Sequence, residues 1–404
     1  MNFPRTALLF SLSTAAPAAV AVPRFEAQVV DAAIGIGYGL AVGDVDGDGK
    51  ADILLADARE IVYYRNPTWQ KQRITGALTK RDHVCLAARD IDGDGKVEIA
   101  VGAQWNPGET SNDAESGAVF YLQRPSTGTG DWTAVPLPHE PTVHRMHWVK
   151  DGQGQAHLVV VPLHGRDNKN GIGPQGARIL SMPFPAQPAD PKAWKPQLVS
   201  DALHVSHNFD LRPQGTGEAM VIGGREGFLA AIPKSTGPGW DAPLHELADV
   251  PGTALSFAGI GEIRFSPPGP DRPAGSMLAA IEPFHGPHLA VYAKDAATRQ
   301  WTRRVIDSSM NQGHALACGD LLGGGGTQII VGWREPDAAG EFGIRIHWQE
   351  KPDQPWQKSW IAGGKRMACE DLKLADLDGD GKLDVIAAGR STKNVEIYWN
   401  RTVP

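Results

Sequence analysis

The sequence predicts an all-β, seven-bladed β-propeller of four-stranded blades. One acidic loop occurs three times almost unchanged, beginning at Asp44, Asp90 and Asp376, and each copy precedes an apolar run. Short segments led by an aromatic residue recur at intervals of roughly 45 to 65 residues, which suits one blade per repeat. The 404 residues include 47 Gly and 31 Pro and show no long helical periodicity, which favours strands joined by turns.

The acidic loops have the composition of a metal-binding turn. Carboxylates at alternate positions, with glycines that let the backbone curl, present hard oxygen ligands to one Ca²⁺ or Mg²⁺. The loop begins like an EF-hand but lacks its final bidentate Glu, because Leu55, Val101 and Ala387 stand at that position. The flanks read as strands, so we expect metal-stapled hairpins with a structural role. The predicted ligands are Asp44, Asp46, Asp48 and Asp52; Asp90, Asp92, Asp94 and Glu98; and Asp376, Asp378, Asp380 and Asp384.

The aromatic-led segments count seven blades. The first has no blade before it, and the last apolar segment, Val395–Trp399, has no aromatic-led strand after it. We therefore expect the first strand to complete the last blade, because closing the ring hides the edges of an open sheet. The segments begin at Phe25, Trp69, Trp132, Trp194, Trp240, Trp301 and Trp356.

The N-terminus has the features of a signal peptide, with Arg5 before an apolar stretch and a small-residue end at Ala21. We expect residues 1–21 to be removed, residues 22–404 to form one propeller domain, and the protein to be secreted or periplasmic. No other apolar segment is long enough to span a membrane. A net charge of −7 without a basic stripe makes nucleic acid an unsuitable partner. Three cysteines in predicted innermost strands are expected to be buried thiols: Cys85, Cys318 and Cys369.

The first strand of each blade lines the central channel of a propeller. Counting back six residues from the first Asp of an acidic loop finds the residue at the channel mouth. Degenerate loops in three blades make the register there a matter of best alignment. The residues placed at the mouth are Tyr38, His144, His207, Glu262, His314 and Glu370, with His83 one residue further out.

Several imidazoles in one register suit a catalytic Zn²⁺ with an open position for substrate. We expect His144, His207 and His314 as ligands, with His83 as a further candidate. His204 is an alternative to His207, because the shortened loop allows either alignment. Each histidine taken alone is equally consistent with capping a strand or lining a wet tunnel.

The loops after the second strands should surround the same mouth. They combine Arg, Asn and Glu with Trp, the mixture that binds a sugar through its hydroxyls and its apolar ring face. The alternative is solvated loops with chance charges. The candidate substrate-binding residues are Trp105, Arg166, Arg225, Glu282, His285, Trp333, Arg334, Arg390 and Lys393.

The acidic hairpins and the apolar strands after them resemble the FG-GAP or VCBS type of propeller repeat. Channel-mouth segments such as His144–Trp148, His204–Phe209 and Ile281–His285 are similar to the propeller domain of the aldos-2-ulose dehydratase family. That resemblance implies a zinc-dependent lyase that dehydrates keto sugars such as 1,5-anhydrofructose. Because the sequence stops at residue 404, we expect the cupin and lectin-like domains of that family to be absent.

The expected reaction is β-elimination from a carbonyl-bearing sugar, with Zn²⁺ polarising the carbonyl or an adjacent hydroxyl. Glu370 or Glu262 would remove the α-proton. Tyr38 or His164 would protonate the departing hydroxyl, and Arg166 and Arg334 would position this small sugar substrate.

Two other functions stay open. A carbohydrate- or protein-binding propeller would tolerate loss of the inner histidines. A polysaccharide lyase would use His164, Tyr38 and Arg166 on an acidic polymer. The sequence indicates neither the exact sugar and leaving group nor the oligomeric state.

Overall fold

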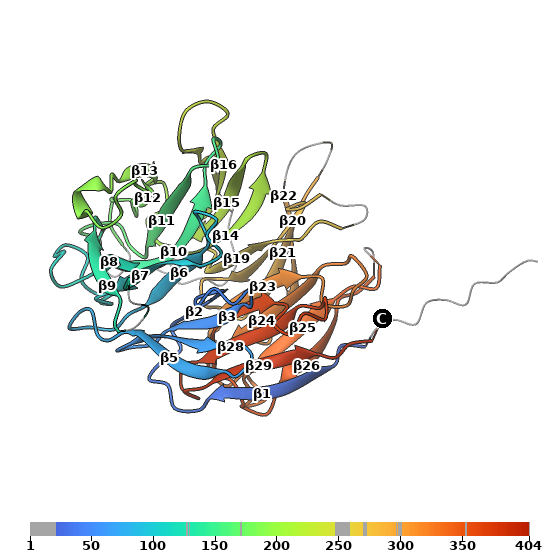
Figure 1. The fold of residues 1–404 in the computed structure, drawn as a ribbon. Coiled ribbons are helices and arrows are strands. Elements are labelled where there is room, and N and C mark those ends of the chain that lie inside the picture. Colours follow the sequence, from blue (N-terminus) through green and yellow to red (C-terminus); the bar gives the residue numbers. More distant parts are fainter. Residues whose placement is uncertain are drawn as a thin grey trace, which may run out of the picture.

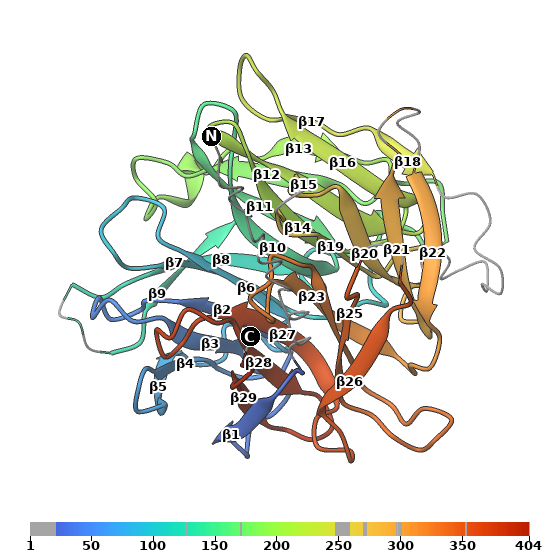
Figure 2. The ribbon, with the colours of Figure 1, turned by 90° about the vertical axis from the view of Figure 1, so that its right-hand side faces the viewer.

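The computed structural model describes residues 22–403, apart from 127, 129, 170–171, 247–258, 270–272, 296, 298–300 and 352–353. These residues form seven antiparallel sheets arranged as blades of a ring (Figure 1). The first strands of successive blades contact one another around the centre, and the seventh contacts the first (Figure 2). The predicted seven-bladed propeller is confirmed. The predicted signal peptide, residues 1–21, lies outside the described residues.

The first four blades follow one another along the chain. Blade four departs from the four-stranded plan, because two short strands, β17 and β18, both pair with β16. A short 3₁₀ helix, Pro191–Ala193, precedes β13. The strands are β2 (Gly39–Gly43), β3 (Asp52–Ala56), β4 (Ile61–Arg65) and β5 (Gln70–Thr75); β6 (Cys85–Arg89), β7 (Glu98–Ala103), β8 (Ala118–Gln123) and β9 (Thr133–Leu137); β10 (Val143–Lys150), β11 (Ala156–Pro162), β12 (Ile179–Pro183) and β13 (Gln197–Ser200); and β14 (Ser206–Gln214), β15 (Gly217–Gly224), β16 (Gly227–Pro233), β17 (Trp240–Asp241) and β18 (Leu244–Glu246).

The last blade closes the ring. Its outermost strand is β1, which pairs with β29 from Phe25 opposite Asn400 to Asp31 opposite Val395. The expected completion of the final blade by the N-terminal strand is therefore confirmed. The strands of blades five to seven are β19 (Glu262–Phe265), β20 (Met277–Glu282), β21 (His288–Lys294) and β22 (Trp301–Asp307); β23 (Gly313–Gly319), β24 (Gln328–Trp333), β25 (Ile344–Trp348) and β26 (Gln357–Ala362); and β27 (Cys369–Ala375), β28 (Asp384–Gly389), β29 (Val395–Asn400) and β1 (Phe25–Asp31).

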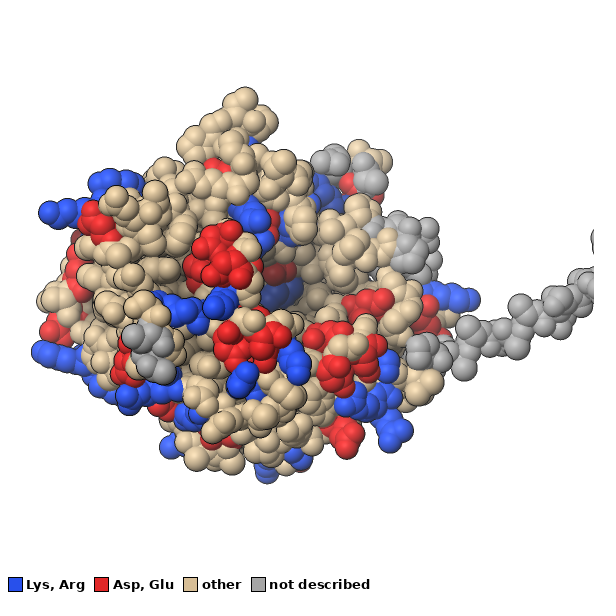
Figure 3. All heavy atoms as spheres, viewed as in Figure 1, with Lys and Arg blue, Asp and Glu red and all other residues tan. Residues whose placement is uncertain are grey.

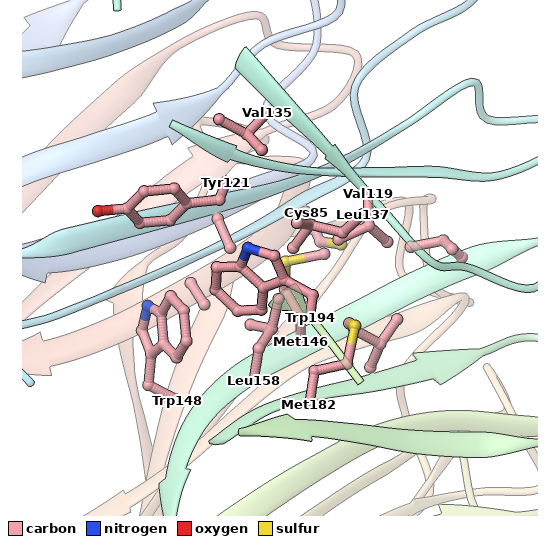
Figure 4. Close-up of a cluster of buried hydrophobic side chains, with 14 of the residues drawn as sticks. Cys85, Val119, Tyr121, Val135, Leu137, Met146, Trp148, Leu158, Met182 and Trp194 are labelled. Carbon is pink, nitrogen blue, oxygen red and sulfur yellow. The ribbon is translucent and has the colours of Figure 1, made fainter. Parts of the chain in front are cut away.

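Apolar side chains fill the space between neighbouring blades. Between blades two and three, Trp148, Trp194 and Tyr121 pack with Met182 (Figure 4). The indole N–H of Trp148 donates to the Glu98 carbonyl at 3.0 Å, so burying this ring leaves no donor unpaired. Packing of this kind holds the innermost strands at fixed positions around the channel. None of the three cysteines forms a disulfide; Cys85 and Cys369 are buried as predicted, whereas Cys318 is only partly buried.

Three acidic loops join the first and second strands of blades one, two and seven. The Asp44 carboxylate accepts hydrogen bonds from the N–H groups of Gly47 and Gly49 at 2.6 and 2.7 Å. Both glycines have a φ near +80°, a conformation that side chains disfavour. The loop therefore gathers its oxygens as a hard cation requires. The groups whose oxygens lie within 4.8 Å of one another are Asp44, Asp46 and Asp48; Asp90, Asp92 and Asp94; and Asp376, Asp378 and Asp384.

The position of the fourth predicted ligand relative to the clustered oxygens differs among the three loops. Asp52 is buried and accepts two backbone N–H groups at 2.9 Å, and Glu98 accepts one at 2.9 Å. These two carboxylates tie the loop to its blade and stand outside the clustered oxygens. In the third loop Asp384 joins the cluster, whereas Asp380 lies 3.3 Å from the Lys382 ammonium. Three carboxylates per loop therefore lie close together, and the fourth predicted ligand of each loop stays a prediction.

We expect Asp44→Ala to lower the free energy of unfolding by about 2 kcal/mol, because two backbone donors lose a charged acceptor. Added Ca²⁺ should raise the melting temperature of the chelator-treated wild type more than that of the variant. Thermal and urea unfolding measure both effects. Asp131→Ala, at an exposed carboxylate outside these loops, is the control. An equal response to Ca²⁺ in both variants would contradict a cation site at this hairpin.

A second stability prediction concerns Asp307 at the end of β22. Its carboxylate lies 2.9 Å from His347 Nε2 and 3.0 Å from Lys358 Nζ, and it accepts from the Ser309 hydroxyl at 2.7 Å. Burial alone would raise the pKa of Asp307, but these partners hold that pKa well below its usual range. The stabilisation is therefore present above the unfolded pKa of about 3.9 and is lost as the pH falls below it. We expect Asp307→Asn to cost about 3 kcal/mol at pH 7 and to flatten the acid limb of stability measured by urea unfolding. An unchanged acid limb would contradict this assignment.

The surface carries both signs of charge. Figure 3 shows Asp and Glu side chains gathered in clusters, with Lys and Arg atoms between them, over the middle of one face. Within the described part of the chain, no helix is both long enough and apolar enough to cross a membrane.

Candidate metal centre

The inner strands are irregular where they reach the channel mouth. The pairing register shifts between Val143 and Arg145, between Ser206 and Phe209, between Gly313 and Ala315, and between Cys369 and Asp371. β-bulges of this kind re-aim a side chain and are common beside functional sites. The residues inside these four shifts are His144, His207 with Asn208, His314 and Glu370.

Three histidines converge at this mouth. His207 of β14, His314 of β23 and His285 of the β20–β21 loop each offer a ring nitrogen, and these nitrogens lie within 4.8 Å of one another. His207 Nε2 and His285 Nε2 are 2.9 Å apart. The ring centroids of His285 and His314 are 4.8 Å apart. These three imidazoles could hold one metal ion, and three histidines are the protein ligands of some open zinc sites.

The opposite ring nitrogens fix the orientation of two of these imidazoles. His207 Nδ1 donates to the Gly261 carbonyl at 3.0 Å, and His314 Nδ1 donates to the Glu370 carbonyl at 2.6 Å. A neutral imidazole has one N–H, so Nε2 of both rings carries a lone pair toward the cluster. Metal-binding histidines are oriented by the same kind of backbone hydrogen bond.

Burial keeps these histidines in the form that binds metals. Desolvation is the main cause that lowers the pKa of His207, and it holds the pKa of His285 and His314 well below the usual value. All three rings are therefore neutral at pH 7. Without a metal, the short contact between two Nε2 atoms needs a proton on His285, and a cation would take the place of that proton.

His144 borders this group. Its ring centroid lies 4.5 Å from that of His207, and its other face stacks on Trp105 at 4.9 Å. Its buried Nε2 has no hydrogen-bond partner among the described residues. An unsatisfied nitrogen beside three converging imidazoles fits a metal centre better than a purely structural cluster. The donor set is suited to Zn²⁺.

Two other histidines of the sequence analysis lie apart from the group. Nδ1 of His83 donates to the Asp57 carbonyl at 3.0 Å and its Nε2 accepts from the Leu78 N–H at 3.2 Å, so both ring nitrogens are occupied. The expectation that His83 joins the ligands is corrected by this geometry. His204 pairs with Glu226 at 2.9 Å. Of His204 and His207, it is therefore His207 that enters the cluster.

Glu262 contacts His207 on the side away from His285 and helps to orient its ring. It is fully buried, with one oxygen 3.1 Å from His207 Nδ1 and the other accepting from Asn208 and Arg264 at 2.8 and 2.9 Å. Burial opposes its ionisation, but the charge of Arg264 and the contact with His207 lower its pKa to about 2. A carboxylate held in this way is a poor proton acceptor. The geometry favours Glu370 over Glu262 as the base.

Glu370 lies beside the cluster between two arginines. One of its oxygens is 3.9 Å from His314 Nε2 and accepts from Arg390 at 2.9 Å; the other accepts from Arg334 at 3.2 Å. Arg334 also lies 3.4 Å from His285 Nδ1. Arg334, Glu370 and Arg390 therefore form a row of charged groups that lies next to the histidines. A carboxylate has about four lone-pair sites, so two remain for a substrate proton.

Tyr38 flanks the same row. The guanidinium of Arg390 lies 5.7 Å from the centre of its ring, and its hydroxyl donates to Asp82 at 3.2 Å. Burial and the charge of Asp82 raise the pKa of Tyr38 to about 12. The phenol is therefore protonated at neutral pH and can act as a proton donor.

Three predicted substrate residues make other contacts. Glu282 is fully buried and bonds to Arg303 and Tyr292 inside blade five. Trp333 is fully buried and donates to the Glu341 carbonyl at 3.1 Å. Arg166 pairs with Glu140 and Asp113, each at 2.9 Å. Glu282 and Trp333 are therefore too buried to contact a substrate, which corrects their predicted role. Arg166 is partly exposed and held in ion pairs, and its predicted substrate contact stays a prediction.

The remaining predicted residues lie in loops after second strands. His164 is buried, with Nδ1 lacking a hydrogen-bond partner among the described residues, and burial lowers its pKa to about 4. The Arg225 N–H donates to the Val205 carbonyl at 2.8 Å. Lys393 is exposed, with a φ of +52°. Trp105, His285, Arg334 and Arg390 are the loop residues that contact the channel-mouth group.

His285 was predicted as a substrate contact, and the structure places one of its ring nitrogens within 4.8 Å of those of His207 and His314. His285 follows Phe284, whose N–H donates to the Gly259 carbonyl at 2.8 Å and whose φ is +47°. This backbone turn brings His285 over the mouth. The signal in the sequence was a histidine close behind a second strand, and only the turn distinguishes a ligand from a loop residue.

Comparison with known proteins finds similarity to FG-GAP repeats in part of the chain, residues 44–122. Residues 44–101 match the FG-GAP-like repeat and residues 86–122 match the FG-GAP repeat. The chain is 24% identical over 320 residues to aldos-2-ulose dehydratase of Phanerodontia chrysosporium, a distant similarity that covers 73% of this chain. The match spans about a third of that relative, 34% of its length.

Solved structures show likeness of fold alone. The crystal structure of BBS1N in complex with ARL6DN, soaked with mercury, has a TM-score of 0.54 at 13% identity and covers 94% of this chain and 96% of its own. The crystal structure of the mitotic checkpoint complex gives a TM-score of 0.53 at 12% identity and covers 98% of this chain and 99% of its own.

Proposed function

We propose that this propeller is a zinc-dependent lyase that removes water from a keto sugar by β-elimination. The observation that carries the proposal is the buried histidine group beside Glu370, in which two imidazoles are oriented by backbone carbonyls. The distant relative bears the name of a dehydratase, and the similarity covers most of this chain. A pure binding module has no need of neutral, converging imidazoles beside a carboxylate.

His207, His285 and His314 would hold the ion, with His144 at its side. When bound there, Zn²⁺ supplies a Lewis acid that polarises the sugar carbonyl and makes its α-proton more acidic. Arg334 and Arg390 carry positive charge next to the place where negative charge develops on the substrate.

The proton transfers are assigned to the chain's own residues. Glu370 removes the proton from the carbon next to the carbonyl, and the electron pair of that C–H bond forms a carbon–carbon double bond. The C–O bond at the β-carbon breaks, and the oxygen leaves with a proton from the Tyr38 hydroxyl as water. In the structure this hydroxyl donates to Asp82 at 3.2 Å, so it must rotate from Asp82 toward the leaving oxygen before the proton is transferred. The products are an unsaturated ketone and one water.

The polysaccharide-lyase alternative loses its main support in this geometry. In that mechanism Arg166 would have to exchange its two carboxylate partners, Glu140 and Asp113, for a uronate, and none of its ion pairs among the described residues reaches the histidine group. The non-catalytic alternative is decided by the assay below.

The test is incubation of the zinc-loaded protein with 1,5-anhydrofructose while the ultraviolet absorbance of a conjugated enone is followed. We expect absorbance to grow in proportion to enzyme and to stop when the zinc is chelated. Polyuronates and neutral polysaccharides serve as comparison substrates. Absence of product from keto sugars, with zinc bound at the histidines, would overturn the lyase proposal.

A further inference from the structure

The central channel continues below the histidine group as a cavity of about 190 Å³. All seven innermost strands line it, and its lining residues stand one to four positions beyond the channel mouth, toward the acidic hairpins. One water occupies about 30 Å³ in the liquid, so the cavity has room for several waters or for a small ion with part of its hydration shell. None of its lining residues takes part in the proposed proton transfers.

Charged side chains from separate blades face this cavity. Lys373 lies 2.8 Å from Asp371, whose carboxylate also accepts two backbone N–H groups. Arg264 is matched by Glu262 at 2.9 Å. Asp210 accepts the Phe265 N–H at 2.8 Å. Two of the three cations that line the channel therefore have a carboxylate partner.

Arg145 of β10 is the exception. Its side chain lines the cavity and the residue is 9% exposed. Its guanidinium donates to the His144 carbonyl at 3.0 Å and contacts His144 Nδ1 at 3.4 Å. No carboxylate among the described residues lies within 4 Å of it. A buried guanidinium without an anion is unfavourable, whereas Arg–anion hydrogen bonds are strong because both partners are charged.

We propose that the channel cavity binds a small, singly charged anion, a halide or a simple carboxylate, at Arg145. The charges of Arg264 and Lys373 are balanced by Glu262 and Asp371, and the Asp210 carboxylate also faces the cavity, so the anion would bind at Arg145 itself. The guanidinium of Arg145 has donors left over after its contact with His144, and the anion accepts from them. The inference does not depend on the lyase activity, because it rests on the cavity and on the unmatched charge.

Bromide is the probe, because its anomalous X-ray scattering distinguishes it from water. Crystals of the zinc-loaded protein are grown in bromide at the concentration of an ordinary salt buffer. We expect an anomalous peak in the channel at hydrogen-bond distance from Arg145. The peak should disappear in Arg145→Gln and persist in Arg73→Gln, which removes an exposed arginine of β5. The structure of each variant verifies its fold.

A solution measurement excludes binding at crystal concentration only. Chloride that binds to a protein broadens the ³⁵Cl nuclear resonance. We expect this broadening with the wild type and with Arg73→Gln, and added bromide should reverse it by competing for the site. Arg145→Gln should cause little broadening. If Arg145→Gln does not crystallise, the ³⁵Cl comparison tests whether the anion binds at Arg145. If Arg145→Gln does not fold, the position of the bromide peak in wild-type crystals tests it. An anomalous map with water alone in the channel, or a bromide peak that Arg145→Gln leaves unchanged, would overturn the proposal. An adventitious ion only, bound at the surface, would also overturn it.

Discussion

About one zinc ion per chain is expected in the purified protein, and His285→Ala should lose it. Removing one of three imidazoles breaks a site whose remaining ligands cannot enclose the ion. We expect zinc affinity to fall by at least about 100-fold, because even residues that only orient a ligand are worth 10- to 100-fold. Elemental analysis after mild chelation measures the stoichiometry, and competition with a chromogenic chelator measures the affinity.

His204→Ala is the matched control, because His204 is a partly exposed histidine near the channel mouth that pairs with Glu226 outside the cluster. Its zinc content should equal that of the wild type. His207→Ala and His314→Ala should behave as His285→Ala does. Zinc retained in His285→Ala, or calcium alone in the wild type, would contradict the assigned centre and leave a binding propeller as the better account.

Glu370→Gln should lower kcat for dehydration by roughly 1,000-fold, the effect typical of losing a general base. The amide keeps the size of the side chain and can still contact Arg334 and Arg390, so KM should change far less than kcat. Zinc content should be unchanged, since Glu370 orients His314 through its backbone carbonyl. Steady-state kinetics on the keto sugar, with metal analysis of the same sample, separates these effects.

Glu335→Gln serves as the control for this variant, because Glu335 is an exposed glutamate in the loop that carries Arg334. Its kinetics should match those of the wild type. A Glu370→Gln enzyme with normal kcat would exclude Glu370 as the base. A fall in kcat that accompanies loss of zinc would assign Glu370 to the metal centre.

Local patterns in the sequence were sufficient for the architecture. The local sequence of the acidic hairpins is enough to predict their turn, because alternate carboxylates and glycines that can adopt a positive φ specify one backbone conformation. The aromatic-led strands gave the number of blades, and the pairing of β1 with β29 follows from their arrangement along the chain. Each of these features depends on residues close in sequence or on a repeat, so no tertiary information was needed.

Register along the inner strands was also readable, and it placed His144, His207, His314 and Glu370 at the channel mouth. The degenerate loop of blade four left His204 and His207 as alternatives. Hydrogen bonding decided between them, because His204 turns to Glu226 while His207 donates to Gly261 across the blade boundary. Contacts between blades join residues about fifty positions apart, and no local pattern encodes them.

The ring, its closure and the set of polar residues near the channel could all be predicted from the repeats. Which of these residues contact one another depends on how the blades fold and pack. A turn at Phe284 brings His285 next to His207 and His314. Four other predicted site residues make contacts elsewhere in the protein: His83, Glu282, Trp333 and Arg166. A ligand set depends on distances of a few ångströms between side chains from different blades, and bulges and packing set those distances whatever the residue type.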